Sequence, residues 1–207
     1  YKTTDGGTKW NELPTGADHG FRALDIAVDS HNPQALWLFT LTVDEKTNSF
    51  PDAAQKTALK STDGGKTWAS LASAFPSGYR VPISGTVNPN DSNNAFIPTQ
   101  TMTGQQKSFA TTDGGKTWTA SNVYMMVVAF DPTNATGKRM LGYNPYESGG
   151  GIYQSTDKGL TWSRYANVPP EVNNSDKLGV RIESFAFSKS ASGTIYMGGS
   201  NANVWKS

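Results

Sequence analysis

The sequence contains no cysteine, so it has neither a disulfide framework nor thiol chemistry. This absence is compatible with a cytoplasmic protein and also with many secreted bacterial enzymes. No apolar run reaches the roughly 18 residues that a membrane-spanning helix needs, and we expect no membrane insertion. A surplus of either charge is lacking too, because 18 basic residues face 17 acidic ones. This balance argues against nucleic acid or an anionic membrane surface as a partner.

Histidine is scarce, and His19 and His31 are isolated in the sequence. Two separate histidines without cysteine argue against a zinc site and give no support for a Ser-His-Asp triad. No glycine-rich loop follows a strand and opens a helix, which leaves nucleotide binding unsupported. We therefore expect no metal and no cofactor.

What the sequence does have is a motif that occurs four times. The copies are YKTTDGGTKW (1–10), KSTDGGKTW (60–68), ATTDGGKTW (110–118) and QSTDKGLTW (154–162), with aspartates Asp5, Asp63, Asp113 and Asp157 and tryptophans Trp10, Trp68, Trp118 and Trp162. The aspartates are 58, 50 and 44 residues apart, and Lys9 in the first copy stands where the others have threonine. The terminal VWKS (204–207) resembles the lead-in to a fifth copy.

The segments between the copies repeat as well. Each contains a strand-like run, a polar turn and a second run, and two further strands flank the motif; the first runs are FRALDIAVD (21–29), YRVPISGTV (79–87), VYMMVVAFD (123–131) and VRIESFAFS (180–188). Four short strands per unit of about 40–50 residues is the period of propeller blades. We predict an all-β chain, a β-propeller of four-stranded antiparallel blades, and a single segment over residues 1–207 that is part of a larger propeller. The expected units are 1–18, 19–76, 77–121, 122–166 and a partial unit at 180–207.

The aspartate of the motif is expected to support a turn. Glycines such as Gly64 and Gly65 permit positive φ, and the aspartate can accept amide protons of its own turn. A calcium loop does not fit, because glycines stand where such a loop needs carboxylates. A residue repeated four times cannot serve one active centre, and this turn lies on the face opposite the loops that join blades. We predict a structural role for all four aspartates and their tryptophans.

The S/T-x-D-x-G-x-T-W pattern resembles the Asp-box, or bacterial neuraminidase repeat. The units around it resemble Asp-box propellers, which include sialidases, xyloglucan-active glycoside hydrolases, sortilin-type receptors and photosystem II assembly propellers. The resemblance covers essentially all 207 residues. It implies the fold, whereas the same repeat serves both hydrolases and pure binding proteins.

Arginines at the start of the innermost strands are the first candidates for a site. Arg22, Arg80 and Arg181, with Tyr124 near the matching place, are expected to line the channel, and guanidinium forks suit a carboxylate. YRVP (79–82) resembles the Y/F-R-I-P element of sialidases, which implies an arginine triad for a sugar carboxylate. Against this, residues 198–200 lack the arginine that the later sialidase segment supplies. The alternative is that each arginine is solvated or paired with Asp18 or Asp176.

The strand-turn-strand sequence of the units, as in AVDSHNPQALWL (27–38), more closely resembles that of the xyloglucan-active hydrolases. This resemblance implies two acidic residues across a cleft, one general acid and one base. Acidic residues expected on the open rim are Asp18, Asp44, Glu45, Glu147 and Glu171, but none lies in a motif that transfers a role, so the catalytic residues stay unknown. Tyr143, Tyr146 and Tyr165 are candidates either to stack on sugar rings or to pack in the loops.

These resemblances predict an extracellular or cell-surface, carbohydrate-active propeller, a glycoside hydrolase or a fragment of one that acts on plant or cell-surface glycans. A non-catalytic Asp-box propeller that binds protein or glycan is the alternative, and a sialidase-like protein is a third. The substrate-binding candidates are Arg22, Arg80, Tyr124, Arg181, Tyr146, Glu147 and Asp18. We expect a glycan or protein ligand on the open rim, and further propeller blades or a second propeller. The start at Tyr1, without an initiator Met, indicates a mature or excised segment.

Overall fold

The structure is a computed structural model. It describes residues 1–14, 21–43, 58–76, 78–79, 81–101, 103–146, 150–166, 181–191, 193–200 and 203–207, together with the single residues 47, 168 and 172. Several predicted rim residues lie outside the described residues, namely Asp18, Asp44, Glu45, Arg80, Glu147, Glu171 and Asp176. Within the described ranges, no helix is both long and apolar enough to cross a bilayer.

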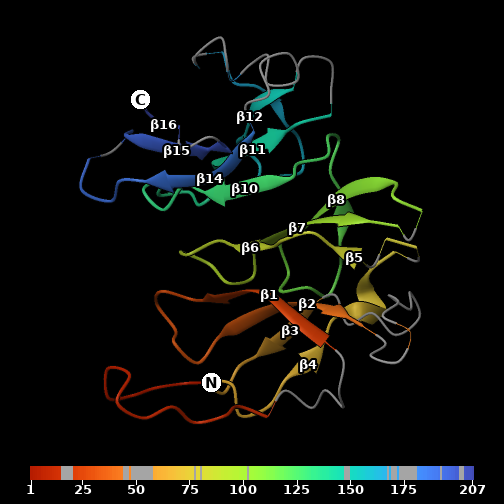
Figure 1. The fold of residues 1–207 in the computed structure, drawn as a ribbon, viewed down its shortest axis with the longest axis vertical. Coiled ribbons are helices and arrows are strands. Elements are labelled where there is room, and N and C mark those ends of the chain that lie inside the picture. The colour runs from red at the N-terminus through yellow and green to blue at the C-terminus, as the bar shows by residue number, and fades with distance from the viewer. Residues whose placement is uncertain are drawn as a thin grey trace.

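Four antiparallel sheets follow one another along the chain (Figure 1). Blade A has β1 (Phe21–Val28), β2 (Leu36–Thr42), β3 (Ala58–Ser61) and β4 (Ala69–Ser70), and the 3-10 turn η2 (Ala72–Ala74) follows it. Blade B has β5 (Val81–Pro82), β6 (Thr86–Val87), β7 (Ala95–Gln100), β8 (Gln106–Thr111) and β9 (Thr119–Ala120). Blade C has β10 (Val127–Phe130), β11 (Met140–Asn144), β12 (Gly151–Ser155) and β13 (Ser163–Arg164), and blade D has β14 (Ile182–Phe187), β15 (Ile195–Gly199) and β16 (Val204–Lys206). The predicted all-β propeller of antiparallel blades is confirmed.

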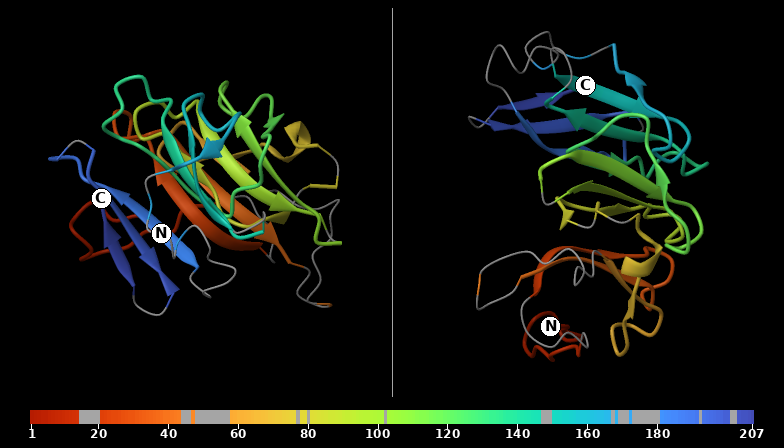
Figure 2. Two further views of the ribbon diagram at one scale, coloured as in Figure 1. Left: turned by 90° about the horizontal axis from the view of Figure 1, so that it is seen from above. Right: turned by 90° about the vertical axis from the view of Figure 1, so that its right-hand side faces the viewer.

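The blades form an open arc. In Figure 1 and the right view of Figure 2, the N-terminal segment and blade D lie at opposite ends of the long axis, and the left view places both on the same side. Within each blade the strands are joined in chain order, from the innermost first strand outward. The first strands β6, β10 and β14 lie beside one another, and β1 contacts β6. The inner edge of the arc is therefore built from first strands.

The strand register places each copy of the Asp motif at one end of its blade. Leu36 in β2 pairs with Val28 at the end of β1 and with Ser61 at the end of β3. Arg22, at the start of β1, pairs with Leu41 instead. The Asp motif and the start of the first strand are thus at opposite ends of the blade, as the sequence pattern predicts.

The second strand of one blade packs an aromatic ring on the Asp motif of the next. Trp37 in β2 is fully buried and lies edge-on to Trp118 of blade B, with ring centroids 6.2 Å apart. Phe96 in β7 occupies the same place and lies 5.5 Å from the ring of Trp162 in blade C. Burying such rings is a large favourable term, because each removes a wide apolar area from water. The cores of the molecule therefore lie between the blades as well as within them.

Candidate functional site

Each Asp motif is a closed hydrogen-bonded turn, which the copy in blade A illustrates. The Ser61 hydroxyl donates to Asp63 Oδ1 at 2.8 Å and accepts the Gly65 amide at 2.9 Å. Asp63 accepts the Thr67 amide at 2.9 Å and the Thr67 hydroxyl at 2.6 Å. The same bonds recur around Asp113 and Asp157, and around Asp5 without the last one, because Lys9 has no hydroxyl to donate. The carboxylates are occupied by their own turns.

These hydrogen bonds lower the pKa of the aspartates. The Thr117 hydroxyl, followed by the Thr117 amide, lowers the pKa of Asp113 from 3.8 to about 2. The Thr67 hydroxyl and amide hold the pKa of Asp63 still further below its ordinary value. Burial raises the pKa of Asp157, but bonds from Thr161 and Ser155 outweigh it and leave a lowered value. Groups held in the ionised form in this way are poor proton donors at neutral pH.

A cavity of about 260 Å³ lies on the inner edge of the arc, among the middle parts of the first strands. It is lined by residues at corresponding strand positions of all four blades: Asp25, Ser84, Gly85, Met126, Val127, Val128, Glu183, Ser184 and Phe185. Burial raises the pKa of the Asp25 carboxyl, and the Ile26 amide opposes this only in part. Asp25 and Glu183 are the two carboxyl groups among the described residues that line this cavity.

At the end of the channel away from the Asp motifs, two tyrosines and an arginine come together. Tyr124 and Tyr146 have ring centroids 5.8 Å apart with planes tilted by 47°. Burial, and then the neighbouring Tyr146, raise the pKa of Tyr124, whereas Arg181 lowers it. Arg181 Nη2 lies 3.3 Å from Met126 Sδ, and Arg181 Nε lies 3.4 Å from Glu183 Oε1. We call Tyr124, Tyr146, Arg181 and Glu183 the rim cluster.

The structure thus places the sequence candidates in two groups. Tyr124, Tyr146 and Arg181 are brought together, and Tyr146 is 62% exposed. Arg22 is exposed at the start of β1, and no described contact joins it to the rim cluster. Tyr143 is buried in the core between blades C and D and is not available to a ligand.

Sequence reasoning missed Asp25 and Glu183, which line the cavity of about 260 Å³ among the first strands.

A different opening, of about 470 Å³, lies at the Asp-motif end, where the turns after the first strands meet. There Ser30 Oγ donates to the Pro89 carbonyl of the next blade, and Asn90 Nδ2 donates to the Pro132 carbonyl at 3.0 Å. Over the described part of the chain, no three histidine, aspartate or glutamate side chains are grouped so that they could hold a metal ion.

Comparison with known proteins agrees with this architecture. The BNR/Asp-box repeat family matches residues 109–120, one copy of the motif. Among solved structures, the GH74 enzyme of Niastella koreensis is 19% identical with a TM-score of 0.58, and covers 91% of this chain and 28% of its own. The GH74 xyloglucanase of Xanthomonas campestris is 14% identical with a TM-score of 0.61, covering 90% of this chain and 30% of its own.

An ancestral GH74 enzyme is 17% identical, with a TM-score of 0.58, and covers 92% of this chain and 24% of its own. At these identities the likeness is one of fold. The chain spans less than a third of the length of these solved structures. No curated protein matches the sequence significantly.

Proposed function

Because this chain is a run of Asp-box β-propeller blades, we propose that it is the glycan-holding part of a carbohydrate-active propeller, with the rim cluster as its binding site. One observation carries the proposal: the exposed ring of Tyr146 rests against Tyr124 beside the Arg181–Glu183 pair. Sugar rings stack on exposed aromatic faces, and their hydroxyls bond to flanking donors and acceptors. The solved relatives named as GH74 enzymes, one of them a xyloglucanase, support a polysaccharide as the ligand.

The proposal extends to glycoside hydrolysis. Such hydrolysis uses one protonated carboxyl group as an acid and one carboxylate as a base or nucleophile. Asp25 has the raised pKa that suits an acid, and Glu183, paired with Arg181, is placed to act as the carboxylate. Both line the same cavity, so we assign these two roles to them. The aspartates of the Asp motifs take no part in this hydrolysis, because the hydrogen bonds within their turns keep them ionised.

The test is binding and digestion of xyloglucan and other plant and cell-surface glycans. We expect Tyr146→Ala to weaken glycan binding at least about tenfold, as loss of an aromatic anchor does. Tyr1→Ala, which removes another exposed tyrosine, is the matched control and keeps the affinity. Asp25→Asn should retain binding but lose cleavage, whereas Glu183→Gln, which changes a residue of the rim cluster, should lose cleavage and also weaken binding. Absence of both binding and cleavage over the whole glycan set would reject the proposal.

A non-catalytic binding module is the second candidate. The half-exposed Arg181–Glu183 pair beside two tyrosines favours it, because arginine and tyrosine are enriched at protein interfaces. In that case the wild-type chain binds a glycan or peptide at the rim cluster and cleaves nothing. A sialidase-like activity, the third candidate, needs Arg22 and Arg80 to join Arg181 around a sugar carboxylate; cleavage of a sialoside by the wild type and its loss in Arg181→Ala would identify it.

We also propose that the protein acts outside the cell or at its surface, where polysaccharides are met. Further propeller blades or a second propeller belong to the same working unit. The lengths of the solved relatives support this, since the chain matches 28% and 30% of the first two. Detection of the protein in the secreted fraction of its source cells tests the location.

A further inference from the structure

The methionines of the chain differ in how far they are buried. Met125 and Met140 are fully buried, and Met197 is only 7% exposed. Met126 is not buried, alone among the methionines that the structure describes. It stands just before β10 and lines the cavity of about 260 Å³ among the first strands. Its thioether, a soft and polarizable group, is therefore open to small molecules that enter the channel.

Backbone hydrogen bonds hold Met126 in place beside this cavity. Its amide donates to the Tyr143 carbonyl at 2.8 Å, and its carbonyl accepts the Ser84 hydroxyl of blade B at 3.4 Å. The residues directly after it, Val127 and Val128, pair with β11. Blades B and C together therefore fix the point from which the methionine side chain enters the cavity.

A guanidinium lies beside the methionine sulfur. Arg181 of blade D places Nη2 3.3 Å from Met126 Sδ and Nε 3.4 Å from Glu183 Oε1. A thioether is a weak hydrogen-bond acceptor, and the ion pair is long, with the two side chains 52% and 54% exposed. An exposed pair of this kind contributes little free energy, so a change in either acceptor can move the guanidinium.

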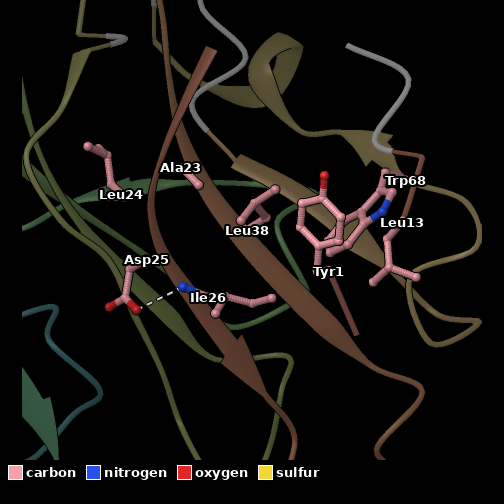
Figure 3. A pocket seen from close by; sticks show the side chains of 8 residues that line it. All are labelled: Tyr1, Leu13, Ala23, Leu24, Asp25, Ile26, Leu38 and Trp68. Carbon is pink, nitrogen blue, oxygen red and sulfur yellow. Dashed lines mark hydrogen bonds between the residues drawn. The ribbon is translucent and has the colours of Figure 1, made fainter. Parts of the chain in front are cut away.

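The second carboxyl group of the cavity does not hold this arginine. Asp25 Oδ1 accepts the amide of Ile26, its neighbour in β1, at 2.8 Å (Figure 3). Among the described residues, Arg181 forms its salt bridge with Glu183 alone. Met126 and Glu183 are therefore the two side chains whose acceptor atoms share the guanidinium.

We propose that Met126 is a site of reversible oxidation by hydrogen peroxide, and that its sulfoxide draws Arg181 away from Glu183. A lone pair of the sulfur forms a bond to one peroxide oxygen while the O–O bond breaks, and the other oxygen leaves as hydroxide. The proton on the transferred oxygen then passes to this hydroxide, which gives the sulfoxide and one water. The sulfur is oxidised by two electrons and the peroxide is reduced.

Oxidation changes the hydrogen bonding of the Met126 side chain. A sulfoxide is polar, and its oxygen accepts a charge-assisted hydrogen bond from a guanidinium. The new oxygen takes up space beside Sδ, so Arg181 moves back and turns its donors toward it. The 3.4 Å contact of Arg181 with Glu183 is then lost. These two steps need no glycan, whereas an effect on glycan binding rests on the function proposed for the rim cluster.

Treatment of the folded chain with hydrogen peroxide, read by peptide mass spectrometry, tests the site of oxidation. We expect Met126 to gain one oxygen at least about tenfold faster than the three buried methionines, because buried sulfurs react only when the core opens. Fragmentation of the peptide between Met125 and Met126 separates these neighbours, and unfolding in urea should remove the difference. Methionine sulfoxide reductase should restore the thioether. Equal oxidation rates of Met126 and the buried methionines in the folded chain overturn the proposal.

The NMR signal of the Arg181 Nε–H, assigned by its loss in Arg181→Lys, follows the movement of the guanidinium. After peroxide treatment this signal should shift in the wild type and stay unchanged in Met126→Leu, which keeps the volume but removes the sulfur. Met102→Leu, at a methionine outside the described residues, is the matched control and should respond like the wild type. Circular dichroism checks that the oxidised chain stays folded. A signal that does not shift while Met126 is fully oxidised overturns the proposal.

A glycan that binds the wild type connects this oxidation to the rim cluster. Its affinity should fall about twofold to fivefold after oxidation, the range that an exposed ion pair carries, and should not fall in Met126→Leu. Unchanged affinity of the fully oxidised wild type overturns the coupling. If the untreated wild type binds no glycan, the proposed function fails, while the oxidation and the shift of the Arg181 signal still decide the present proposal.

Discussion

Trp37 meets Trp118 edge-on, with ring planes at 89°, although the two residues belong to different blades. Trp37 Nε1 also donates to the Ser92 carbonyl at 3.0 Å, so both its ring and its polar atom are held by blade B. Edge-to-face contact is a favoured geometry for aromatic pairs. Blade A is thereby fixed to blade B by one side chain of its second strand.

Phe96→Ala should strongly destabilise the protein. The ring is fully buried against Trp162 and Met140, and loss of a buried phenylalanine costs about 3–5 kcal/mol. Tyr196 pairs with the first strand of blade D as Phe96 does with that of blade B, but it is 38% exposed, so Tyr196→Ala should cost far less. The free energy of unfolding from denaturant titration at low protein concentration measures both. Equal losses would show that position, not burial, decides the effect.

The tryptophans of the Asp motifs differ in the hydrogen bond of their indole nitrogen. Trp162 Nε1 donates to the Gly159 carbonyl at 2.9 Å, whereas Trp118 Nε1 is buried with no partner among the described residues. Trp162→Phe should therefore lose about 1 kcal/mol more stability than Trp118→Phe, since the former removes a formed hydrogen bond and the latter relieves a buried unpaired N–H. Paired chemical denaturation of the two variants measures the difference. The opposite order would contradict the geometry.

The fourth box places a lysine where the others have glycine. Lys158 has φ 66°, and the corresponding Gly64 and Gly114 have φ 76° and 77°. A side chain in this left-handed region costs about 1–2 kcal/mol, partly offset by the greater freedom of glycine when unfolded. Lys158→Gly should therefore raise the free energy of unfolding by about 0.5–1 kcal/mol. Lys138→Gly is the control: the Lys138 carbonyl accepts the Lys158 amide, but Lys138 itself does not have a positive φ, so this change should not stabilise.

Acid should destabilise the protein by protonating the aspartates of its Asp motifs. A carboxyl group whose pKa is lowered by folding contributes stability above its unfolded pKa of about 3.8, and this contribution is lost as pH falls through the folded value. For Asp113 the loss falls between pH 3.8 and about 2. Urea unfolding at a series of pH values should show this decline. Asp113→Asn, less stable at neutral pH, should show a smaller decline over the same range.

Asp25→Asn should have the opposite pH dependence. Burial raises the pKa of Asp25, so its contribution to stability is present below pH 3.8 and is lost as pH rises through the folded value. The neutral amide avoids the partial desolvation of the carboxylate at pH 7, and because Asp25 is still exposed to solvent it should be only slightly more stable than the wild type there. The advantage should vanish in acid below pH 3.8. Lower stability of Asp25→Asn at pH 7 would refute the assigned direction.

The fold could be predicted because each blade repeats the same strands, turns and box. Tyr124 and Arg181 could also be located, since both stand at the start of a first strand. Asp25 and Glu183 could not, because the register shifts between Ala23 and Asp25 and again between Ile182 and Ser184. A bulge breaks the alternation of side chains, so the face of the residues beside it cannot be counted from sequence. Neither residue is repeated in the other blades, so the repeat pattern does not identify them.

The turn-to-turn bonds from Ser30 to the Pro89 carbonyl and from Asn90 to the Pro132 carbonyl set a wedge angle. They draw successive blades together at the inner radius, while Trp37 and Phe96 hold them apart farther out. The ratio of these two spacings fixes how far each blade is rotated from the last. The circumference of a closed propeller is therefore determined locally at each junction, by the turn-to-turn hydrogen bond at the inner radius and the aromatic side chain farther out.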